Sequence, residues 1–411
     1  MNRTAKNHHL VVFGATSFVG QILARYLFER YGASGALSWA IAGRSQSKLS
    51  EVRASLGAGA GALPIIVAEA SDTGSLRELC AEARVVVSTV GPYALHGSPL
   101  VQVCAETGTD YCDLTGEVQW IARMLAAHES TAKRSGARIV HCCGFDSIPS
   151  DLGTFFLQER ARELFGAPCS RVKLRVKAAR GSASGGTVAS IMNIAREVTT
   201  DPSVRALLAN HYVLTPDGGA GRPRQPEVRF VERDPDAAGF VAPFLMSGMN
   251  TRIVHRSNAL LGDAFGKDFV YDEALLTGPG LAGWLKASAV APAMLGFLLG
   301  AALPPTRYLL QRFVVPKPGE GPSLEAQSRG FFDLRFFGIA RDGRVIRTKV
   351  TGDRDPGYGS TAKMLGEAAA CLAFDTEDDR PGGFWTTASL FGNRLISRLS
   401  EHAGLTFEVI E

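Results

Sequence analysis

A glycine-containing segment after the first apolar run constrains the fold of this chain more than any other feature. Residues 10–13 (LVVF) are strand-like, and residues 18–31 carry apolar side chains at helical spacing. The segment GATSFVG, at residues 14–20, joins the two. A strand, a glycine-containing turn and a helix in this order are typical of a loop that binds the phosphates of a dinucleotide. A turn with a purely structural role is the alternative.

The residues of this loop have separable roles. Gly14 permits a tight turn, and Gly20 permits close packing of the helix against the strand. Ser17 stands where the ideal spacing has its middle glycine, and it adds a hydroxyl donor near the phosphates. The N–H groups of the first helical turn, helped by the helix dipole, can hold a pyrophosphate. The predicted cofactor-binding positions of the loop are Gly14, Thr16, Ser17, Phe18, Val19 and Gly20.

Further short apolar runs alternate with helical stretches through the first part of the chain. They lie at residues 38–42, 63–67, 84–88, 110–114 and 137–141. This pattern predicts an α/β fold with a Rossmann-type, doubly wound parallel sheet. We predict a dinucleotide-binding domain at residues 1–150 and an inserted α+β substrate domain at 151–355. The C-terminal helices at 356–411 are expected to return to the first domain.

Composition narrows the class of protein. The chain has 411 residues, of which 45% are hydrophobic and 20% charged, which excludes a disordered chain. A net charge of +4 is low for a protein that coats nucleic acid. Seven cysteines without a CxxC pair indicate reduced thiols in a cytoplasmic compartment and no metal site. The N-terminal residues lack the apolar region of a signal peptide.

The end of the second predicted strand indicates which nicotinamide cofactor is bound. An NAD site usually has Asp or Glu there to bond the ribose 2′-hydroxyl. This chain has Arg44 and Ser45 instead. A guanidinium can pair with a 2′-phosphate and stack on adenine, and a serine hydroxyl can donate to the same phosphate. We therefore predict NADPH. An arginine that only caps the sheet edge is the alternative.

Residues that follow the later strands are further candidates, because ligands of open α/β sheets lie beyond the carboxyl ends of the strands. Asp72 is predicted to contact adenine or to cap a helix, and Gly91 and Pro92 to lie against the nicotinamide ribose. Residues 110–117 and 143–151 should lie on the same rim. Their side chains able to hold or protonate a substrate, or to cap a helix, are Tyr111, Asp113, Glu117 and Asp146.

Four segments in the later part of the chain also have patterns that predict a structure or a function. Residues 171–177 alternate apolar and basic side chains, which predicts a solvated basic face or a surface for an acidic carrier protein. Residues 184–187 (SGGT) precede a helix, and they predict either an anion site at the helix N-terminus or an ordinary helix start. Residues 316–323 (PKPGEGPS) are turn-rich. Residues 287–305 are uncharged. There are three alternatives for this segment: a buried or dimer-covering helix, a segment that touches lipid or lines an acyl tunnel, or a membrane span.

Taken together, these motifs resemble the saccharopine dehydrogenase-like oxidoreductases, and within them the branch of trans-acting enoyl reductases of polyketide lipid synthesis. The matching stretches are GATSFVG (14–20), AGRS (42–45), STVGPYALHG (88–97), DYCDLTGE (110–117), CCGFDSIPSDLG (142–153), SGGT (184–187), PKPGEGPS (316–323), GYGSTAKMLGEAA (357–369) and GLTFEV (404–409).

The resemblance implies an NADP(H)-dependent reduction of an α,β-unsaturated acyl thioester carried on a polyketide synthase or acyl carrier protein. Tyr93 and Tyr111 are then the candidate proton donors. Two other functions stay open at this point. One is a saccharopine-type amino-acid (imine) dehydrogenase, and the other is a non-catalytic, lipid-associated NADP-binding protein. A homodimer and peripheral contact with a membrane are also open.

Overall fold

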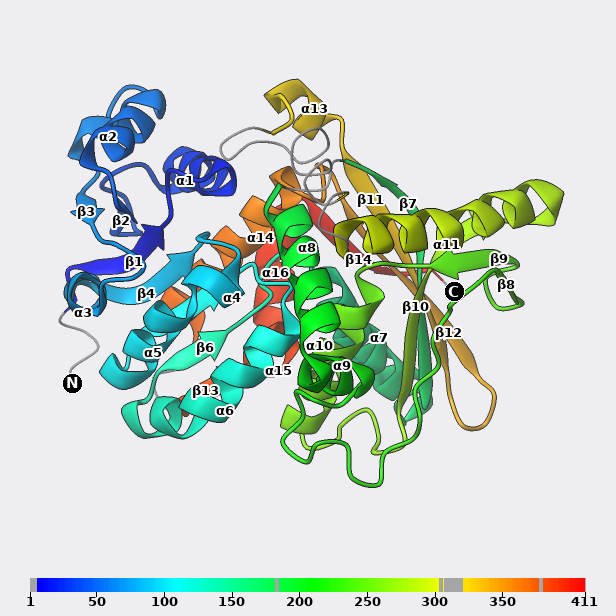
Figure 1. Cartoon of the computed structure of the whole chain (residues 1–411). Helices are drawn as coiled ribbons and strands as arrows, with labels where there is room; N and C mark the ends of the chain where they lie inside the picture. The colour runs from blue at the N-terminus through cyan, green and yellow to red at the C-terminus, as the bar shows by residue number, and fades with distance from the viewer. Residues whose placement is uncertain (1–5, 182–184, 303–305, 307–320, 377–379, 411) are drawn as a thin grey trace.

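The structure is a computed structural model that describes residues 6–181, 185–302, 306, 321–376 and 380–410. Two seven-stranded sheets organise these residues, and helices pack around both sheets (Figure 1). The first sheet is built mainly from the N-terminal part of the chain, and the second sheet is built mainly from its later part. Helix α8 runs between the two sheets in the view of Figure 1.

The first sheet is parallel throughout and has the strand order β13-β6-β5-β4-β1-β2-β3. This order reverses direction between β1 and β4, as in a doubly wound sheet, and confirms the predicted Rossmann-type fold. Its strands are β1 (His8–Phe13), β2 (Trp39–Gly43), β3 (Ile65–Val67), β4 (Ala83–Ser88), β5 (Asp110–Asp113), β6 (Arg138–Val140) and β13 (Gly383–Trp385).

Helices cover both faces of this sheet. Alternate residues of β1 point to opposite faces, so that Leu10 and Val12 join one apolar core and Val11 and Phe13 join the other. The covering elements are α1 (Phe18–Tyr31), α2 (Gln46–Ser55), the 3₁₀ turn Ala60–Ala62, α3 (Thr73–Glu82), α4 (Tyr93–His96), α5 (Ser98–Thr107) and α6 (Val118–Ser135).

The second sheet is mixed and has the order β14-β12-β11-β7-β10-β9-β8. Strands β7 and β10 are parallel, and the other neighbours are antiparallel. Its strands are β7 (Arg171–Arg180), β8 (Glu232–Asp234), β9 (Gly239–Pro243), β10 (Val270–Gly278), β11 (Phe331–Ile339), β12 (Val345–Gly352) and β14 (Leu405–Val409). The predicted hairpin is β11 and β12.

The remaining helices follow β6 in the chain. They are α7 (Ile148–Phe165), α8 (Gly185–Thr200), α9 (Pro202–Ala209), α10 (Ser247–Leu260), α11 (Gly280–Ala302), α13 (Leu324–Ser328), α14 (Gly359–Ala370), the π-helical turn Cys371–Asp375, α15 (Thr387–Leu390) and α16 (Asn393–His402). The C-terminal segment contributes to both sheets: α14 packs on α1 and β13 joins the first sheet, whereas β14 pairs with β12 of the second. The domain boundaries at residues 150 and 355 stay predictions.

The middle of the basic face of β7 is buried, which corrects the prediction of a solvated face for Lys173 and Arg175, whereas the side chains of Arg171 and Lys177 at its two ends are 42% and 52% exposed. The side chains of Lys173 and Arg175 are buried and form ion pairs with carboxylates. Lys173 Nζ lies 3.2 Å from Asp234, and Arg175 lies 2.6 Å from both Asp234 and Asp272. Buried charges persist only when they are paired in this way, so these cations are unavailable to an acidic partner.

Helix α11 contains the uncharged segment and lies largely exposed. Among the described helices, this one is long and apolar enough to cross a membrane by length and composition, yet only 11% of its apolar window is buried. Leu295 and Leu299 are each more than half exposed. The prediction of a helix is therefore correct, and burial within this chain is wrong.

Some predicted features lie outside the described residues. These are Ser184 of the SGGT motif, residues 303–305 at the end of the uncharged segment, and residues 316–320 of the turn-rich stretch.

Candidate functional site

The loop between β1 and α1 is packed so tightly that two of its positions admit only glycine. Gly14 has a φ of +90°, and a Cβ there would lie 2.7 Å from Val90 Cγ2 and 2.8 Å from Thr89 Oγ1. A Cβ on Gly20 would lie 2.2 Å from the Gly14 carbonyl oxygen. Because both contacts are closer than atoms can approach, the two glycines bring the helix N-terminus against the strand end.

Ser17 holds this loop through its hydroxyl group. Its Oγ accepts from the Gly20 N–H at 2.9 Å and so caps α1. The Thr89 hydroxyl donates to the Gly14 carbonyl oxygen at 2.9 Å and also lies 2.9 Å from Ser17 Oγ. The Ser17 hydroxyl hydrogen is therefore directed to Thr89. In this arrangement the hydroxyl bonds within the protein, and its donation to a phosphate stays a prediction.

Backbone N–H groups remain as the phosphate donors of the loop. Phe18 and Val19 open α1, so their N–H groups have no intrahelical acceptor. In the described part of the chain these two groups have no other acceptor, and neither does the N–H of Thr16. The Thr16 side chain faces Gly43 at the end of β2, with Oγ1 3.9 Å from a Cβ built there. The loop thus offers open donors at the positive end of a helix dipole.

Arg44 and Ser45 follow β2, which lies beside β1. Arg44 is exposed, and its guanidinium contacts no acceptor among the residues that the structure describes. Ser45 caps α2 by accepting from the Lys48 N–H at 3.4 Å, and its hydroxyl lies 3.1 Å from that of Ser47. An unpaired guanidinium next to a helix N-terminus fits a phosphate group, and no carboxylate stands at this strand end.

The other predicted cofactor contacts lie at the same edge of the sheet. Asp72 caps α3 through a 2.9 Å bond from the Gly74 N–H, which is one of its two predicted roles. Gly91 is exposed after β4, and Pro92 forms the N-cap of α4. A Cβ on Gly91 would meet only the ring of Tyr93, at 3.5 Å, among side chains of the described residues. The backbone after β4 is therefore open to a ligand.

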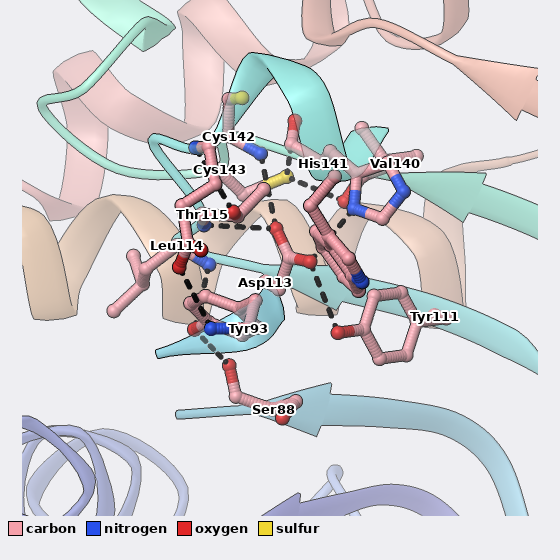
Figure 2. A network of polar contacts seen from close by, with 12 residues as sticks. Ser88, Tyr93, Tyr111, Asp113, Leu114, Thr115, Val140, His141, Cys142 and Cys143 are labelled. Carbon is pink, nitrogen blue, oxygen red and sulfur yellow. Dashed lines mark hydrogen bonds and ion pairs between the residues drawn. The ribbon is translucent and has the colours of Figure 1, made fainter. Parts of the chain in front are cut away.

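Tyr93 and Tyr111 are buried, and both hydroxyl groups are engaged within the protein (Figure 2). Tyr93 donates to the Ser88 carbonyl oxygen at 2.9 Å and accepts from the Leu114 N–H at 3.2 Å. Tyr111 donates to Asp113 Oδ2 at 3.0 Å. Burial raises the pKa of both phenols, and the negative charge of Asp113 adds to the increase. In this arrangement neither hydroxyl has a proton to give to a substrate.

Asp113 is the centre of the network in Figure 2. Besides Tyr111, its carboxylate accepts from His141 Nδ1 at 2.7 Å, from the Thr115 N–H at 3.0 Å and from the Cys142 N–H at 3.2 Å. Its carbonyl oxygen accepts from the Cys143 N–H at 2.7 Å. Asp113 therefore joins the loop after β5 to the loop after β6, and it has a structural role.

Glu117 joins the first sheet to α8. Its carboxylate accepts from the N–H groups of Tyr93 at 2.7 Å and Ala94 at 3.1 Å, and from the Ser190 hydroxyl of α8 at 2.9 Å. Burial raises its pKa, and these hydrogen bonds act in the opposite direction. Helix α8 is thereby fastened over the edge at which the strands end.

The start of α8 is less available to an anion than the SGGT motif predicts. The Gly185 N–H donates to the Tyr358 hydroxyl at 3.0 Å. The ring of Tyr358 packs edge-on against Phe18 of the first loop, with ring centroids 4.8 Å apart. This contact draws α8 and α14 together beside the phosphate loop instead of leaving that amide free.

Asp146 stands apart from the other carboxylates of the rim. It lies after β6 and is half-buried, and burial raises its pKa to about 7. Sequence reasoning included it only as one of several acids, because a sequence does not reveal which carboxylates receive hydrogen bonds.

The described residues fit a dinucleotide. Strands β1 and β2 are neighbours, and at their ends lie the two loop glycines, the loop N–H groups without an acceptor, and the guanidinium of Arg44. Bound there, the cofactor would extend from Arg44 across the first loop toward Gly91 and Pro92. The rim beyond β5 and β6 is then the place left for a substrate.

Comparisons with known proteins agree with this arrangement. Residues 10–140 match the family described as saccharopine dehydrogenase NADP binding domain. A protein of Mycobacterium tuberculosis (strain ATCC 25618 / H37Rv) whose name includes the words "trans-acting enoyl reductase" is 39% identical over 97% of each chain. The trans-acting enoyl reductase of Mycobacterium ulcerans (strain Agy99) is 36% identical and covers 98% of this chain and 97% of its own.

Among solved structures, saccharopine dehydrogenase (L-Glu forming) from Saccharomyces cerevisiae has a TM-score of 0.55. It covers 98% of this chain and 99% of its own, at 11% identity. At that identity the likeness concerns the fold alone, and it extends over both sheets.

Proposed function

Because the chain belongs to the saccharopine dehydrogenase-like family of NADP(H)-dependent oxidoreductases, with full-length relatives named trans-acting enoyl reductases, we propose that it reduces an α,β-unsaturated acyl thioester. One observation supports this most strongly: sequence similarity to those relatives extends over both sheets and is not confined to the nucleotide loop. A reductase with another substrate would be expected to share the first sheet and differ in the second.

The cofactor positions form the first part of the proposal. The bound nicotinamide would supply a hydride to the β-carbon of the substrate. The N–H groups of Thr16, Phe18 and Val19 would hold the pyrophosphate, and Gly91 and Pro92 would lie against the nicotinamide ribose. Arg44, with Ser45, would bind the 2′-phosphate.

The partner forms the second part. A trans-acting reductase receives its substrate from a separate synthase, and we propose a polyketide synthase whose carrier domain holds the thioester. The buried cations Lys173 and Arg175 of β7 cannot receive that carrier. Exposed cations elsewhere, such as Arg180 at the end of β7, are better placed for an acidic carrier domain.

The direct test is oxidation of NADPH, followed by its absorbance, with trans-2-enoyl-CoA or enoyl-pantetheine surrogates of several chain lengths. The product should be the saturated thioester, in equal amount to the NADPH consumed. Absence of turnover at every chain length, with NADPH still bound, would contradict the proposal.

An imine or amino-acid dehydrogenase is less well supported. Such a substrate carries two or more carboxylates and needs cations that converge on it. The buried cations Lys173, Arg175, Arg252 and Arg256 each contact acceptors of the protein itself. Turnover with a keto acid and an amino acid, in place of an enoyl thioester, would favour this alternative.

The exposed apolar helix α11 supports a further proposal about location. We propose that it contacts a lipid surface, since Leu295 and Leu299 are exposed on a helix whose uncharged stretch begins after Lys286. Wild-type protein should sediment with liposomes, and a Leu295→Glu, Leu299→Glu double variant should not. Leu298, half-buried, is a poorer choice for substitution. A dimer in solution that the double variant dissociates would assign the helix to a homodimer interface instead.

A further inference from the structure

One carboxyl group at the rim of the first sheet has no visible role in the fold. Asp146 lies between β6 and α7, and its carboxyl group receives no hydrogen bond from another described residue. Ser147 is the N-cap of α7, but no side chain caps this helix end, so Asp146 is not a capping residue. A carboxyl group placed among buried neighbours without donors is unusual, because burial of an unpaired charge is costly.

The carboxyl group lies between two loops, and the space beside Gly116 is open. A Cβ built on Gly116, after β5, would lie 3.9 Å from Asp146 Oδ1 and would meet no other described atom within 4 Å beyond its chain neighbours. A Cβ built on Gly144, after β6, would lie 3.3 Å from Asp146 Oδ2, 2.7 Å from Leu114 Cδ2 and 3.2 Å from Thr361 Cγ2, so this side of the carboxyl group is packed by the protein. Both loops follow the carboxyl ends of strands, which is where ligands of such sheets bind.

Hydrogen bonds fix the backbone on both sides of Asp146, although its carboxyl group receives none from another described residue. On one side the Cys142 and Cys143 N–H groups donate to Asp113, at 3.2 and 2.7 Å. On the other side the Phe145 N–H donates to the Thr361 hydroxyl at 3.0 Å, and the Phe145 ring packs on Phe332. The fold therefore fixes where the carboxyl group lies without using it.

We infer that Asp146 is the general acid of the proposed reduction and protonates the α-carbon of the unsaturated thioester. The inference rests on the proposed function. When a hydride joins the β-carbon, the electron pair of the double bond moves to the α-carbon as an enolate. The O–H bond of Asp146 then breaks, a C–H bond forms at the α-carbon, and the carboxylate left behind regains a proton from water.

The surroundings keep this acid protonated close to neutral pH. Burial raises the pKa of Asp146 to about 7, the negative charge of Asp113 adds to the increase, and its own N–H opposes it. The other ionisable groups coupled to Asp146 are Tyr93 and Cys142, whose pKa values are also raised, so no described cation favours the carboxylate. A general acid works best when its pKa lies near the working pH.

The test compares wild type with Asp146→Asn, Asp146→Glu and the exposed-turn control Asp342→Asn. Asp146→Asn should lower kcat with an enoyl surrogate by about 100-fold or more and leave the Kd of NADPH within about twofold. Wild-type kcat should fall as pH rises above about 7, whereas the small residual rate of Asp146→Asn should not depend on pH in this range. Asp146→Glu keeps an acid and should retain an intermediate kcat with the pH dependence of wild type.

A second readout does not depend on turnover. Because folding raises the pKa of Asp146, wild type should lose stability as pH rises from 5 to 8, and Asp146→Asn should lose less. The melting temperature of the variant relative to wild type should therefore increase over this range. The control Asp342→Asn should show no such increase.

The outcomes separate the two claims. If wild type reduces the surrogate and Asp146→Asn keeps kcat within threefold, the inference is overturned and the proposed function stands. If the variant loses NADPH affinity together with rate, Asp146 is a structural residue and the inference is again wrong. If wild type reduces no enoyl thioester, the proposed function fails and the general acid fails with it.

Discussion

Replacing Arg44 by alanine tests the cofactor assignment directly. In the described structure this guanidinium is exposed and has no protein partner, so its removal breaks no contact that stabilises the fold. Any loss of NADPH affinity is then a loss of contacts to the cofactor itself. We expect the melting temperature of the free protein to stay within about 1 °C of wild type, as is usual for exposed sites.

The magnitude follows from the chemistry of the contact. A hydrogen bond to a charged group contributes about 1.5–3 kcal/mol, and about 1.4 kcal/mol corresponds to a tenfold change in Kd. Arg44→Ala should therefore weaken NADPH binding by roughly 10- to 150-fold. NADH lacks the 2′-phosphate, so its Kd should change by less than about threefold, allowing for lost stacking on adenine. The ratio of the two dissociation constants should fall toward one.

Isothermal titration of both nucleotides at one fixed salt concentration measures this ratio, because phosphate contacts are sensitive to ionic strength. Arg134→Ala is the matched control. Arg134 is also an exposed arginine of the first sheet's helices, but it lies at the end of α6, where it contacts the Thr131 hydroxyl. Equal affinity of wild type for NADPH and NADH, or an unchanged ratio in Arg44→Ala, would refute the assignment.

Three further predictions concern buried groups. Asp234→Ala removes the carboxylate that the buried Lys173 and Arg175 share, and it should lower the unfolding free energy by about 3–5 kcal/mol. The control Asp236→Ala, at a half-exposed side chain, should lower it by about 1 kcal/mol. Denaturant titrations measure both changes. Folding raises the pKa of Asp151 from 3.8 to about 6, so wild type should lose roughly 2 kcal/mol of stability relative to Asp151→Asn between pH 4 and 7. Unfolding measured as a function of pH gives this difference, and a difference that does not change with pH would contradict the prediction. Tyr111→Phe removes one donor to Asp113 and should cost about 1–2 kcal/mol of stability while kcat stays within about threefold; a large loss of kcat in a stable variant would restore the tyrosine as proton donor.

The first sheet could be predicted from the sequence because its signals are local. Strands β1 to β6 are short apolar runs, and each begins and ends within about two residues of its prediction, whereas β13 near the C-terminus has no prediction. The glycines of the first loop are also local signals, since a turn and a close helix contact require them at fixed spacing. Arg44 was found by its place after the second strand, with no knowledge of its partners.

The sequence failed where partners come from distant parts of the chain. The alternation in β7 is real, but Asp234 and Asp272 lie far along the chain and pair with Lys173 and Arg175, which are buried in the middle of a face predicted to be solvated. The same holds for β14, whose pairing with β12 in the second sheet has no signal in the sequence of either strand. Long-range pairing is not encoded in any local period.

The same reasoning explains why the sequence favours Tyr93 and Tyr111 as proton donors, whereas the structure favours Asp146. A sequence identifies which side chains can donate protons, and on that basis a tyrosine at a strand end is as good as an aspartate. The structure adds an account of which groups are already used. Asp113, Glu117 and Asp151 each accept several hydrogen bonds, and the hydroxyls of Tyr93 and Tyr111 are bound to protein acceptors.

Asp146 alone among these carboxyl groups has no donor from another described residue, and the fold gains nothing visible from its charge. A group that a fold positions precisely but does not use costs stability, and local rules of polar satisfaction are broken most often at functional sites. The neighbours of Asp146 on this rim are all engaged in hydrogen bonds within the protein. Asp113 and the two tyrosines hold the loops and the adjacent strand ends in place. Asp146 is therefore the acid whose proton remains for transfer to the substrate.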